Sequence, residues 1–383
     1  MSKGRDALVV GAIRSPIGSG RTKDSDFKDL SPQDLALQVL DVSFKRTNMP
    51  KEAIQVYRVG SVVSLKSDKF TQAPAREIAL RAGMFNASSG ISEKACSSGL
   101  RAVYEASEAV RHGGVNFAIG AGLDMMSNAP AGANSGALTC PLTKKSMAEL
   151  SDLKARELGF TRYDYDLYAF ESFKKAKKHL CDYSVDGYIA PVSFGGATGP
   201  YLNTDQNVNF REMTQERMQN CGLLRGCQMT TPYNSSKFGD AYAQLTFASP
   251  GAARKYGLPV LAKLLAYAEH TERESKDFIC GPVGAVIKAV KKAKKTLFDI
   301  DSWWINEAFP GSPLYFIDKI SEALWEDVNP WGGAIAFGHA LGATGAVLCV
   351  NAICQTRKEG KKYVVVSLCN AIGEATAAVF EIV

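Results

Sequence analysis

Short apolar runs alternate with segments of helical periodicity along most of the chain. Residues 6–13 are an apolar run that predicts a buried strand, and residues 98–112 repeat apolar side chains at the spacing of one helix face. Further strands are predicted at 116–122, 241–248, 260–268, 303–305 and 363–368, and further helices at 30–46, 72–82, 163–180, 284–297 and from 343 onward. This alternation is typical of an α/β fold built on strand-helix-strand units.

The regular alternation is interrupted between residues 128 and 239, where polar residues, glycine, proline and charged helices predominate. We interpret this segment as an inserted loop domain. It separates a first half, residues 1–127 with about 240–259, from a second half, residues 260–383. The two halves echo one another, because Cys96 and His339 each precede a glycine, an apolar helix and a strand.

Charge and hydrophobicity exclude several classes of protein. The 383 residues are 46% hydrophobic and 22% charged, which is typical of a folded globular chain and excludes a disordered one. Lys and Arg number 45 against 39 Asp and Glu, and the net charge of +6 is spread along the chain. Nucleic acid is therefore not an expected partner. No apolar run reaches the roughly 18 residues that a membrane helix needs, so we expect no membrane span.

Cysteine and histidine usage bears on compartment and metal binding. Nine cysteines, an odd number without Cys-x-x-Cys pairs, favour free thiols in a reducing intracellular compartment. We expect the cytoplasm, and an organelle matrix stays open if a presequence has been removed. Only four histidines are present, none spaced with cysteines as a ligand set, so we expect no metal site.

Cys96 and His339 are the first candidates for chemistry. Cys96 lies just before the helix at 98–112, where unpaired N–H groups and the helix dipole favour a thiolate. His339 lies in the run 332–345, whose glycines we expect to let the backbone pack closely around a bound ligand. Open α/β sheets gather reactive groups where strands end and helices begin, so the two residues can meet and the histidine can activate the thiol. A buried structural cysteine is the alternative for Cys96.

Two further strand ends carry polar or reactive side chains. Asn306 follows the predicted strand at 303–305, and its amide can hold a water or an oxyanion. The next residue, Glu307, is predicted to be a structural acceptor. Cys369 follows the predicted strand at 363–368, and a core cysteine is again the alternative.

Together these motifs resemble the thiolases, the acetyl-CoA acyltransferases of the thiolase superfamily, over nearly the whole chain. The most specific matches are Lys-Ala-Cys-Ser-Ser-Gly-Leu at 94–100, Asn-Glu-Ala-Phe at 306–309, the run 332–345 with its Gly-His, and Cys369. The resemblance implies the thiolase fold, in which two similar βαβαβαββ halves form a five-layered αβαβα sandwich with an inserted loop domain.

The resemblance also implies an activity and a role for each reactive residue. It implies reversible Claisen condensation of acetyl-CoA with an acyl-CoA, or thiolytic cleavage of a 3-oxoacyl-CoA. Cys96 would carry the acyl group and His339 would activate it. Cys369 would move the α-proton, and Asn306 would hold a water at the thioester oxygen of the second substrate.

The substrate contacts and the assembly are implied in the same way. Ser236 would contact the pantetheine arm, Met147 and Phe309 would line the acyl and pantetheine tunnel, and Ala371 would offer a backbone N–H to an oxyanion. Coenzyme A and its thioesters would be substrates, with no permanently bound cofactor. The expected assembly is a homodimer.

The chain departs from the family around the substrate. Ala371 stands where the family has glycine, and it would be strained if the backbone needed a positive φ there. Lys237 and the Gly-Asp-Ala at 239–241 replace the usual Gly and Asn-Asp-Gly. Ser146 stands where a histidine often precedes Met147. These changes leave the four reactive side chains in place and bear on substrate identity and turnover.

The sequence leaves two other functions open. A decarboxylating ketosynthase shares the fold but uses two histidines, and only His339 of this chain lies in a suitable frame. A thiolase-fold binder of acyl-CoA or lipid, without turnover, is the non-enzymatic alternative, and the departures around the substrate are its support.

Overall fold

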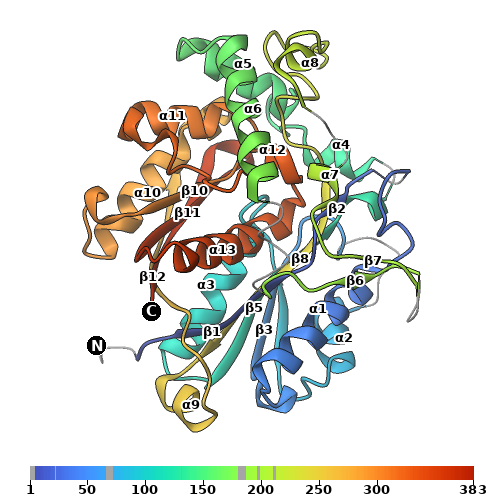
Figure 1. Cartoon of the computed structure of the whole chain (residues 1–383), viewed down its shortest axis with the longest axis vertical. Coiled ribbons are helices and arrows are strands. Elements are labelled where there is room, and N and C mark those ends of the chain that lie inside the picture. The colour runs from blue at the N-terminus through green and yellow to red at the C-terminus, as the bar shows by residue number, and fades with distance from the viewer. Residues whose placement is uncertain are drawn as a thin grey trace.

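The first half of the chain alternates strands and helices, including two strands that the sequence did not predict, at 56–60 and 88–92 (Figure 1). The computed structural model describes residues 5–21, 23–65, 72–130, 132–179, 187–195, 199–209 and 213–383. The elements of this half are β1 (Leu8–Arg14), β2 (Gly18–Ser19), α1 (Pro32–Thr47), β3 (Val56–Gly60), α2 (Pro74–Arg81), β4 (Ser88–Ser92), α3 (Ser98–Arg111), β5 (Phe117–Met125) and, after the insertion, β8 (Gly239–Ala248) and α9 (Pro250–Lys255).

The second half repeats this order, except that one strand is reduced to a single bridge residue. Its elements are β9 (Ala262–Thr271), α10 (Gly281–Lys292), β10 (Ser302–Ile305), α11 (Gly311–Ile320), α12 (Ala334–Phe337), α13 (Leu341–Lys358), β11 (Tyr363–Asn370) and β12 (Glu374–Ile382). In the first half β4 pairs in parallel with β3, whereas in the second half the corresponding position holds a single parallel bridge between Val328 and Trp303 of β10.

The segment beside β10 closes the edge of that strand. The N–H of Trp303 donates to Asp327 O at 3.0 Å, and the N–H of Asn329 donates to Trp303 O at 2.8 Å. The side-chain amide of Asn329 then pairs with the main chain of Ile305, accepting from its N–H at 2.9 Å and donating to its O at 2.7 Å. A side chain thus replaces the next residue of a strand, with Asn329 in the left-handed region at φ 48°.

A short pairing joins the sheets of the two halves. The strands follow the order β10-β11-β12-β9-β1-β8-β5-β3-β4, with β2 paired to β8. Only Leu8 and Val9 of β1 pair with Lys263 and Ala262 of β9, in antiparallel register. On either side of this seam the pairing directions correspond, since β3-β5 and β10-β11 are parallel whereas β5-β8 and β11-β12 are antiparallel.

Helices cover both sheets and fill the space between them, giving the five layers of the thiolase fold. In Figure 1, α1 and α2 lie outside the first half, and α10 and α11 lie outside the second. Helices α3 and α13 pack against each other in the central layer, α3 against β3 and β5, and α13 against β8 and β11. Cys96 and His339 precede these two central helices, so the layer order brings both to one place.

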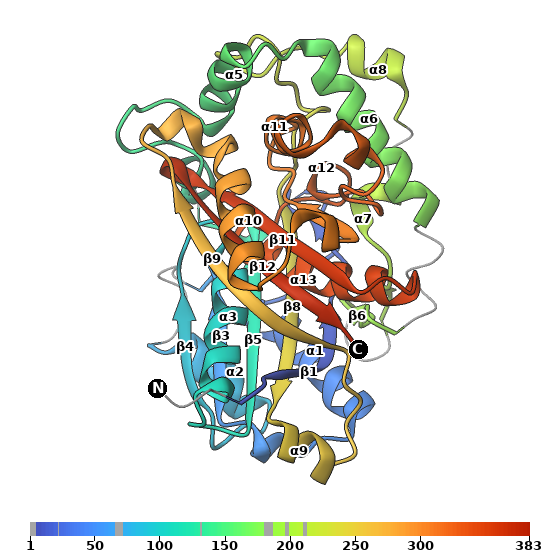
Figure 2. The same ribbon diagram turned by 90° about the vertical axis from the view of Figure 1, so that its left-hand side faces the viewer.

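The longer helices of the insertion lie at one end of the sandwich in both views, whereas its first short strand lies beside α1 of the first half (Figure 2). Its elements are α4 (Ala133–Ala137), α5 (Met147–Glu157), α6 (Arg162–His179), β6 (Val192–Ser193), β7 (Tyr201–Leu202), α7 (Gln206–Asn209) and α8 (Gln215–Gln219). Leu150, Tyr165 and Phe173 belong to the same hydrophobic cluster as β11 and α13. The predicted end of the helix at 163–180 falls on residue 180, outside the described residues.

Glycines of the run 332–345 make room for protein rather than for a ligand, so our interpretation of this run was wrong. A Cβ on Gly345 would lie 2.4 Å from the N atom of Leu100 in α3. A Cβ on Gly342 would lie 2.7 Å from the carboxylate of Asp124, and one on Gly333 would lie 2.3 Å from that of Glu307. At Gly345 the central helices therefore approach too closely for a side chain, whereas Gly342 and Gly333 each make room for a buried carboxylate.

Candidate active site

The loop between β4 and α3 presents the thiol of Cys96. Ala95 holds the left-handed conformation at φ 45°, which costs free energy for a residue with a Cβ and turns the chain sharply before Cys96. Ser98 stabilises this turn from the first residue of α3, because its hydroxyl accepts from the N–H of Lys94 at 2.8 Å and donates to Ala95 O at 2.6 Å. Cys96 itself is half-buried.

His339 reaches the thiol from the other half of the molecule. Gly338 turns the chain at φ 109°, and the N–H of His339 donates to Lys237 O at 2.6 Å. The Nε2 atom of His339 lies 3.2 Å from Cys96 Sγ, and its Nδ1 lies 2.6 Å from the hydroxyl of Thr344. The tautomer that donates from Nδ1 to Thr344 leaves Nε2 free to accept the thiol proton.

Burial makes both partners of this pair neutral. It lowers the pKa of His339 to about 4, so the imidazole is an unprotonated base at neutral pH. Burial, with Cys369 and Asp124 nearby, raises the pKa of the Cys96 thiol above its ordinary value. Our expectation of a thiolate stabilised by the helix dipole was therefore wrong, because loss of solvent outweighs the effect of the α3 N-terminus.

Cys369 and the loop that follows it come from β11. Cys369 is almost fully buried, and burial raises its pKa to about 11 while the hydroxyl of Ser312 opposes the shift. Two hydrogen bonds tie the two cysteine loops together: Ser97 donates to the side chain of Asn370, and Thr376 donates to Ser97 at 2.7 Å. Neighbours of both cysteines thus fix the distance between the loops.

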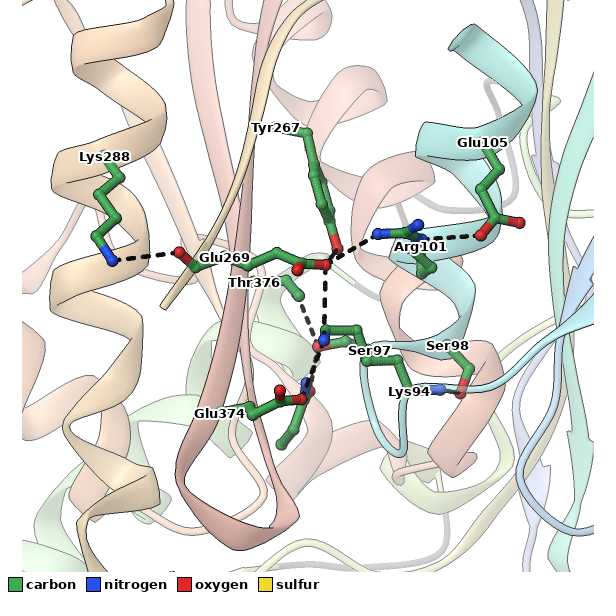
Figure 3. Close-up of polar contacts among 11 residues, drawn as sticks. Lys94, Ser97, Ser98, Arg101, Glu105, Tyr267, Glu269, Lys288, Glu374 and Thr376 are labelled. Atoms are coloured by element: carbon green, nitrogen blue, oxygen red, sulfur yellow. Dashed lines mark hydrogen bonds and ion pairs between the residues drawn. The ribbon is translucent and has the colours of Figure 1, made fainter. Parts of the chain in front are cut away.

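Charged side chains support the nucleophile loop from outside (Figure 3). Lys94 Nζ lies 3.0 Å from the carboxylate of Glu374 and 3.6 Å from that of Glu269, and Arg101 lies 3.1 Å from Glu269. These pairs join the loop and the first turns of α3 to β9 and β12. They are partly exposed, so each contributes little free energy.

Asn306 and Glu307 lie at the end of β10 in different surroundings. Asn306 is buried, and neither polar atom of its side chain has a partner among the described residues, although it does not line the cavity. Its N–H donates to Ser367 O at 2.9 Å, which places it beside the strand that ends at Cys369. Glu307 is a structural acceptor, as predicted, and receives hydrogen bonds from Tyr168, Ser172, Asn329 and the N–H of Ile335.

A cavity of about 450 Å³ contains seven of the eight predicted site residues in its lining. Those residues are Cys96, His339, Cys369, Ser236, Met147, Phe309 and Ala371. Asn306 is the exception. Apolar side chains such as Phe278, Leu138 and Leu341 complete the walls, and no Asp or Glu of the described chain lines them. The cavity suits a long, mostly apolar ligand with few polar anchors.

The surrounding structure explains two of the departures from the family pattern, at Ala371 and Ser146. Ala371 is not in the left-handed region, so the strain considered for it does not arise; the next residue, Ile372, adopts φ 67° instead. Ser146 is the N-cap of α5, where its hydroxyl accepts from the N–H of Glu149 and the Glu149 side chain accepts from the N–H of Ser146. This capping box fixes Met147 at the cavity wall.

Sequence reasoning missed two residues that support His339. Thr344 is one, although it lies in the run 332–345. Asp124 is the other: its fully buried carboxylate accepts hydrogen bonds from the hydroxyl of Ser61 and the N–H groups of Val62, Val63, Ser64 and Gly342. Asp124 therefore joins the loop after β3 to the first turn of α13, directly after His339.

Two searches of the described residues gave negative results. No group of three or more His, Cys, Asp or Glu side chains in those ranges is arranged to hold a metal ion. None of the helices in the same ranges combines the length and apolar character that a membrane span requires.

Comparisons with known sequences identify the family. Residues 7–137 match the family described as "Thiolase, N-terminal domain", and residues 258–382 match the family described as "Thiolase, C-terminal domain". The acetyl-CoA acetyltransferase of Yarrowia lipolytica is 30% identical over 98% of this chain and 96% of its own length. The human peroxisomal 3-ketoacyl-CoA thiolase is 31% identical over 98% of this chain and 91% of its own length.

Solved structures agree with this result. A thiolase from Ascaris suum in complex with coenzyme A is similar with a TM-score of 0.89 at 27% identity, covering 99% of this chain and 100% of that one. The fold of an acetyl-CoA acetyltransferase from Bacillus anthracis matches with a TM-score of 0.93 at 24% identity, covering all of both chains. The chain belongs to the thiolase family and is an enzyme of the thiolase type. The resemblance and the fold expected from the sequence are confirmed.

Proposed function

We propose that this enzyme catalyses reversible Claisen condensation of acetyl-CoA with an acyl-CoA, and the reverse thiolytic cleavage of a 3-oxoacyl-CoA. The acyl group is carried on Cys96. The observation that carries the proposal is the 3.2 Å contact between Cys96 Sγ and His339 Nε2 in a cavity that Cys369 also lines. Two thiols and one neutral imidazole at one point provide a nucleophile, its base and a second acid-base group.

In the acylation step, Cys96 Sγ attacks the thioester carbonyl carbon while His339 Nε2 takes the thiol proton. The carbon-sulfur bond to coenzyme A then breaks, and Cys369 gives its proton to the departing thiolate, which leaves Cys369 as a thiolate and His339 protonated at Nε2. Because burial disfavours a free thiolate, the proton leaves Cys96 only as the new bond forms. The neutral imidazole is ready for this transfer at neutral pH.

In the condensation step, Cys369 as thiolate takes the α-proton of the second thioester. A thiolate whose pKa is about 11 is a strong base for a carbon-bound proton. The enolate oxygen faces His339 and a water on Asn306, whose buried amide has no protein partner in the described chain. The enolate carbon attacks the acyl carbon, the bond to Cys96 breaks, and the proton on His339 returns to Cys96, while Cys369 keeps the α-proton.

The remaining predicted residues hold the substrates in this proposal. Ser236 contacts the pantetheine arm, and Met147 and Phe309 line the tunnel for the pantetheine and acyl chains. The N–H groups of Cys96 and Ala371 hold the oxyanion of the acyl carbon. Loss of one such donor typically costs about 100- to 1,000-fold in rate. The position of all four substrate residues in the cavity wall supports these roles.

The direct test is cleavage of acetoacetyl-CoA by coenzyme A, measured as acetyl-CoA formed. We expect turnover by the wild-type enzyme and a loss of at least about 1,000-fold in Cys96→Ala. Cys221→Ser is the matched control, since Cys221 is a free cysteine away from the cavity lining. Unchanged activity of Cys96→Ala would contradict the proposal. Acylation of Cys96 in the intact-mass spectrum without any product would indicate the binding protein instead.

We propose further that the enzyme is a homodimer, in which β4 of each chain pairs with β4 of its partner. β4 ends the sheet and has a neighbouring strand, β3, on one side only among the described strands. Phe85, in the turn leading to β4, is 58% exposed. Sedimentation equilibrium of Ser89→Pro tests this, because proline cannot donate to a strand ladder. A monomer is expected, and a dimer unaffected by this change would contradict pairing through β4.

The division of the chain and the compartment are proposals too. We propose the halves 1–127 with about 240–259 and 260–383, with 128–239 inserted. Support comes from β8, which pairs with β1 and β5 of the first half. We propose a reducing intracellular compartment, the cytoplasm, because the mechanism needs Cys96 and Cys369 as thiols. Fluorescence microscopy of the tagged full chain tests the compartment.

A further inference from the structure

Lys237 brings an ammonium group to the wall of the catalytic cavity. It follows Ser236 directly and lines the same cavity as Cys96 and His339. Its carbonyl oxygen accepts from the N–H of His339 at 2.6 Å, and the next residue, Phe238, forms a bridge with His339. The backbone of Lys237 is thus held against the catalytic base, and its long side chain begins at the reacting centre.

The side chain of Lys237 ends in an ammonium group that is enclosed by protein. Its Nζ atom is withdrawn from solvent and has no hydrogen-bond partner among the described residues. A compensating contact comes from the ring of Tyr233, whose centroid lies 5.1 Å from Nζ. A buried ammonium without a carboxylate costs several kcal/mol, which a ring face offsets only in part. An anionic group on a ligand would complete this arrangement.

The other cations of the cavity differ from Lys237 in exposure. Arg21 and Arg225 also line it but are exposed, which places them where the cavity meets solvent. Exposed guanidinium groups suit the phosphates of coenzyme A, which remain partly hydrated. Lys237 Nζ is instead enclosed, so it suits an anion on the part of the substrate that enters the cavity. The pantetheine arm that enters with the thioester is uncharged, so the anion would belong to the acyl group.

We propose that Lys237 selects acyl groups that carry a carboxylate, so that the substrates are CoA thioesters of dicarboxylic acids and their 3-oxo derivatives. This inference rests on the proposed function and names its substrate class. The flexible stem of lysine allows Nζ to turn from the Tyr233 ring to the carboxylate. The charge-assisted hydrogen bond formed there gives Nζ the partner that it lacks among the described residues. Such bonds discriminate strongly against analogues that lack the polar group.

The test compares thiolysis of two six-carbon substrates, 3-oxoadipyl-CoA, which ends in a carboxylate, and 3-oxohexanoyl-CoA, which ends in a methyl group. The measured quantity is the ratio of their kcat/KM values. We expect the wild-type enzyme to favour 3-oxoadipyl-CoA by about 10- to 100-fold, the range for one hydrogen bond to a charged group. Lys237→Met should remove this preference and Lys237→Arg should retain most of it. Lys291→Met, an exposed lysine of α10, is the matched control and should leave the ratio unchanged.

Other outcomes would overturn the inference. Equal kcat/KM values for both substrates in the wild type would do so, as would an equal loss on both substrates in Lys237→Met, which would assign the ammonium to the coenzyme A phosphates. If acetoacetyl-CoA is cleaved but 3-oxoadipyl-CoA is not, this inference fails and the proposed function stands. If none of the three is cleaved, both fail. Thermal unfolding of each variant, followed by circular dichroism, shows whether a loss of activity reflects loss of the fold.

Discussion

Helices α3 and α13 occupy corresponding places in the two halves, yet they are held in different ways. Eight of the 14 residues of α3 are buried, and Arg101 on its outer face forms a partly exposed ion pair with Glu269 of β9. Fifteen of the 18 residues of α13 are buried, and its polar side chains have buried partners such as Arg14 for Asn351 and Ser302 for Gln355. The two corresponding helices of the central layer thus differ in exposure: α3 keeps one partly exposed face, whereas α13 is almost entirely buried.

This difference corresponds to the different chemistry at the two helix starts. The nucleophile before α3 must meet substrate, and its loop remains half-buried at the cavity. The base before α13 must stay unprotonated, which requires burial, and its position is fixed by the hydrogen bond of its ring to Thr344 and by the bond from the N–H of Gly342 to Asp124. Substitutions near α13 should therefore have larger effects than substitutions on the outer face of α3.

The largest effect is expected for His339→Ala. Without the base, the buried thiol of Cys96 keeps its proton, and kcat/KM for acetoacetyl-CoA cleavage should fall by about 1,000-fold. The thermal midpoint should fall moderately, because the variant loses the packing of a buried ring and two polar contacts with described residues. A loss below about tenfold would show that another group removes the thiol proton.

Asp124→Ala should cause the next largest effect, on stability. It leaves four buried N–H groups and one hydroxyl without their acceptor. Since each orphaned donor costs about 1–3 kcal/mol and some will find water, the free energy of unfolding should fall by about 3–5 kcal/mol. Urea denaturation measures it. Asp124→Asn, which keeps one acceptor oxygen, should lose less, and equal losses would contradict this account.

The pH dependence of acylation separates a buried base from an ordinary one. The pKa of His339 lies near 4, so the imidazole stays unprotonated as the pH falls from 7.5 to 5.5. The rate of Cys96 acylation should then change less than about twofold over this range. A histidine with the unperturbed pKa of about 6.5 would lose roughly tenfold. Stopped-flow acylation at fixed acyl-CoA gives the profile, and an acid limb near pH 6.5 would contradict the burial argument.

Glu374→Gln on the outer side of α3 should have the smallest effect. Its pair with Lys94 is partly exposed, with a side-chain accessibility of 41% for Glu374. The free energy of unfolding should fall by less than about 1 kcal/mol, and less still in high salt. Turnover should remain within about twofold of wild type. A loss comparable with that of Asp124→Ala would remove the contrast between the two helices.

The sequence was most informative where chemistry and periodicity coincide. The echo between the two helix starts predicted that Cys96 and His339 could meet, and they lie 3.2 Å apart. The apolar faces of α1, α3 and α10 predicted helices within a few residues of their bounds. β4 was not predicted, because a polar edge strand, Ser-Ser-Gly-Ile-Ser, shows no alternation of apolar and polar residues.

Long-range contacts explain what the sequence left out. Asp124 accepts from residues about 60 and 218 positions away, and no local pattern marks such an acceptor. The direction of the Cys96 pKa shift was wrong because the dipole of one helix is a local feature, whereas burial depends on both halves. Lys237 was visible as a departure from the family, but its enclosed Nζ was not.

The amide of Asn329 beside β10 has a consequence for self-association. By imitating a strand residue, it terminates the ladder on the outer margin of the second half and leaves β4 as the uncovered margin of the long sheet in the described chain. A molecule with an unpaired strand at both edges of its sheet could add further copies at each edge and form a fibre. A molecule with one unpaired edge pairs with one second copy, so association stops at the dimer.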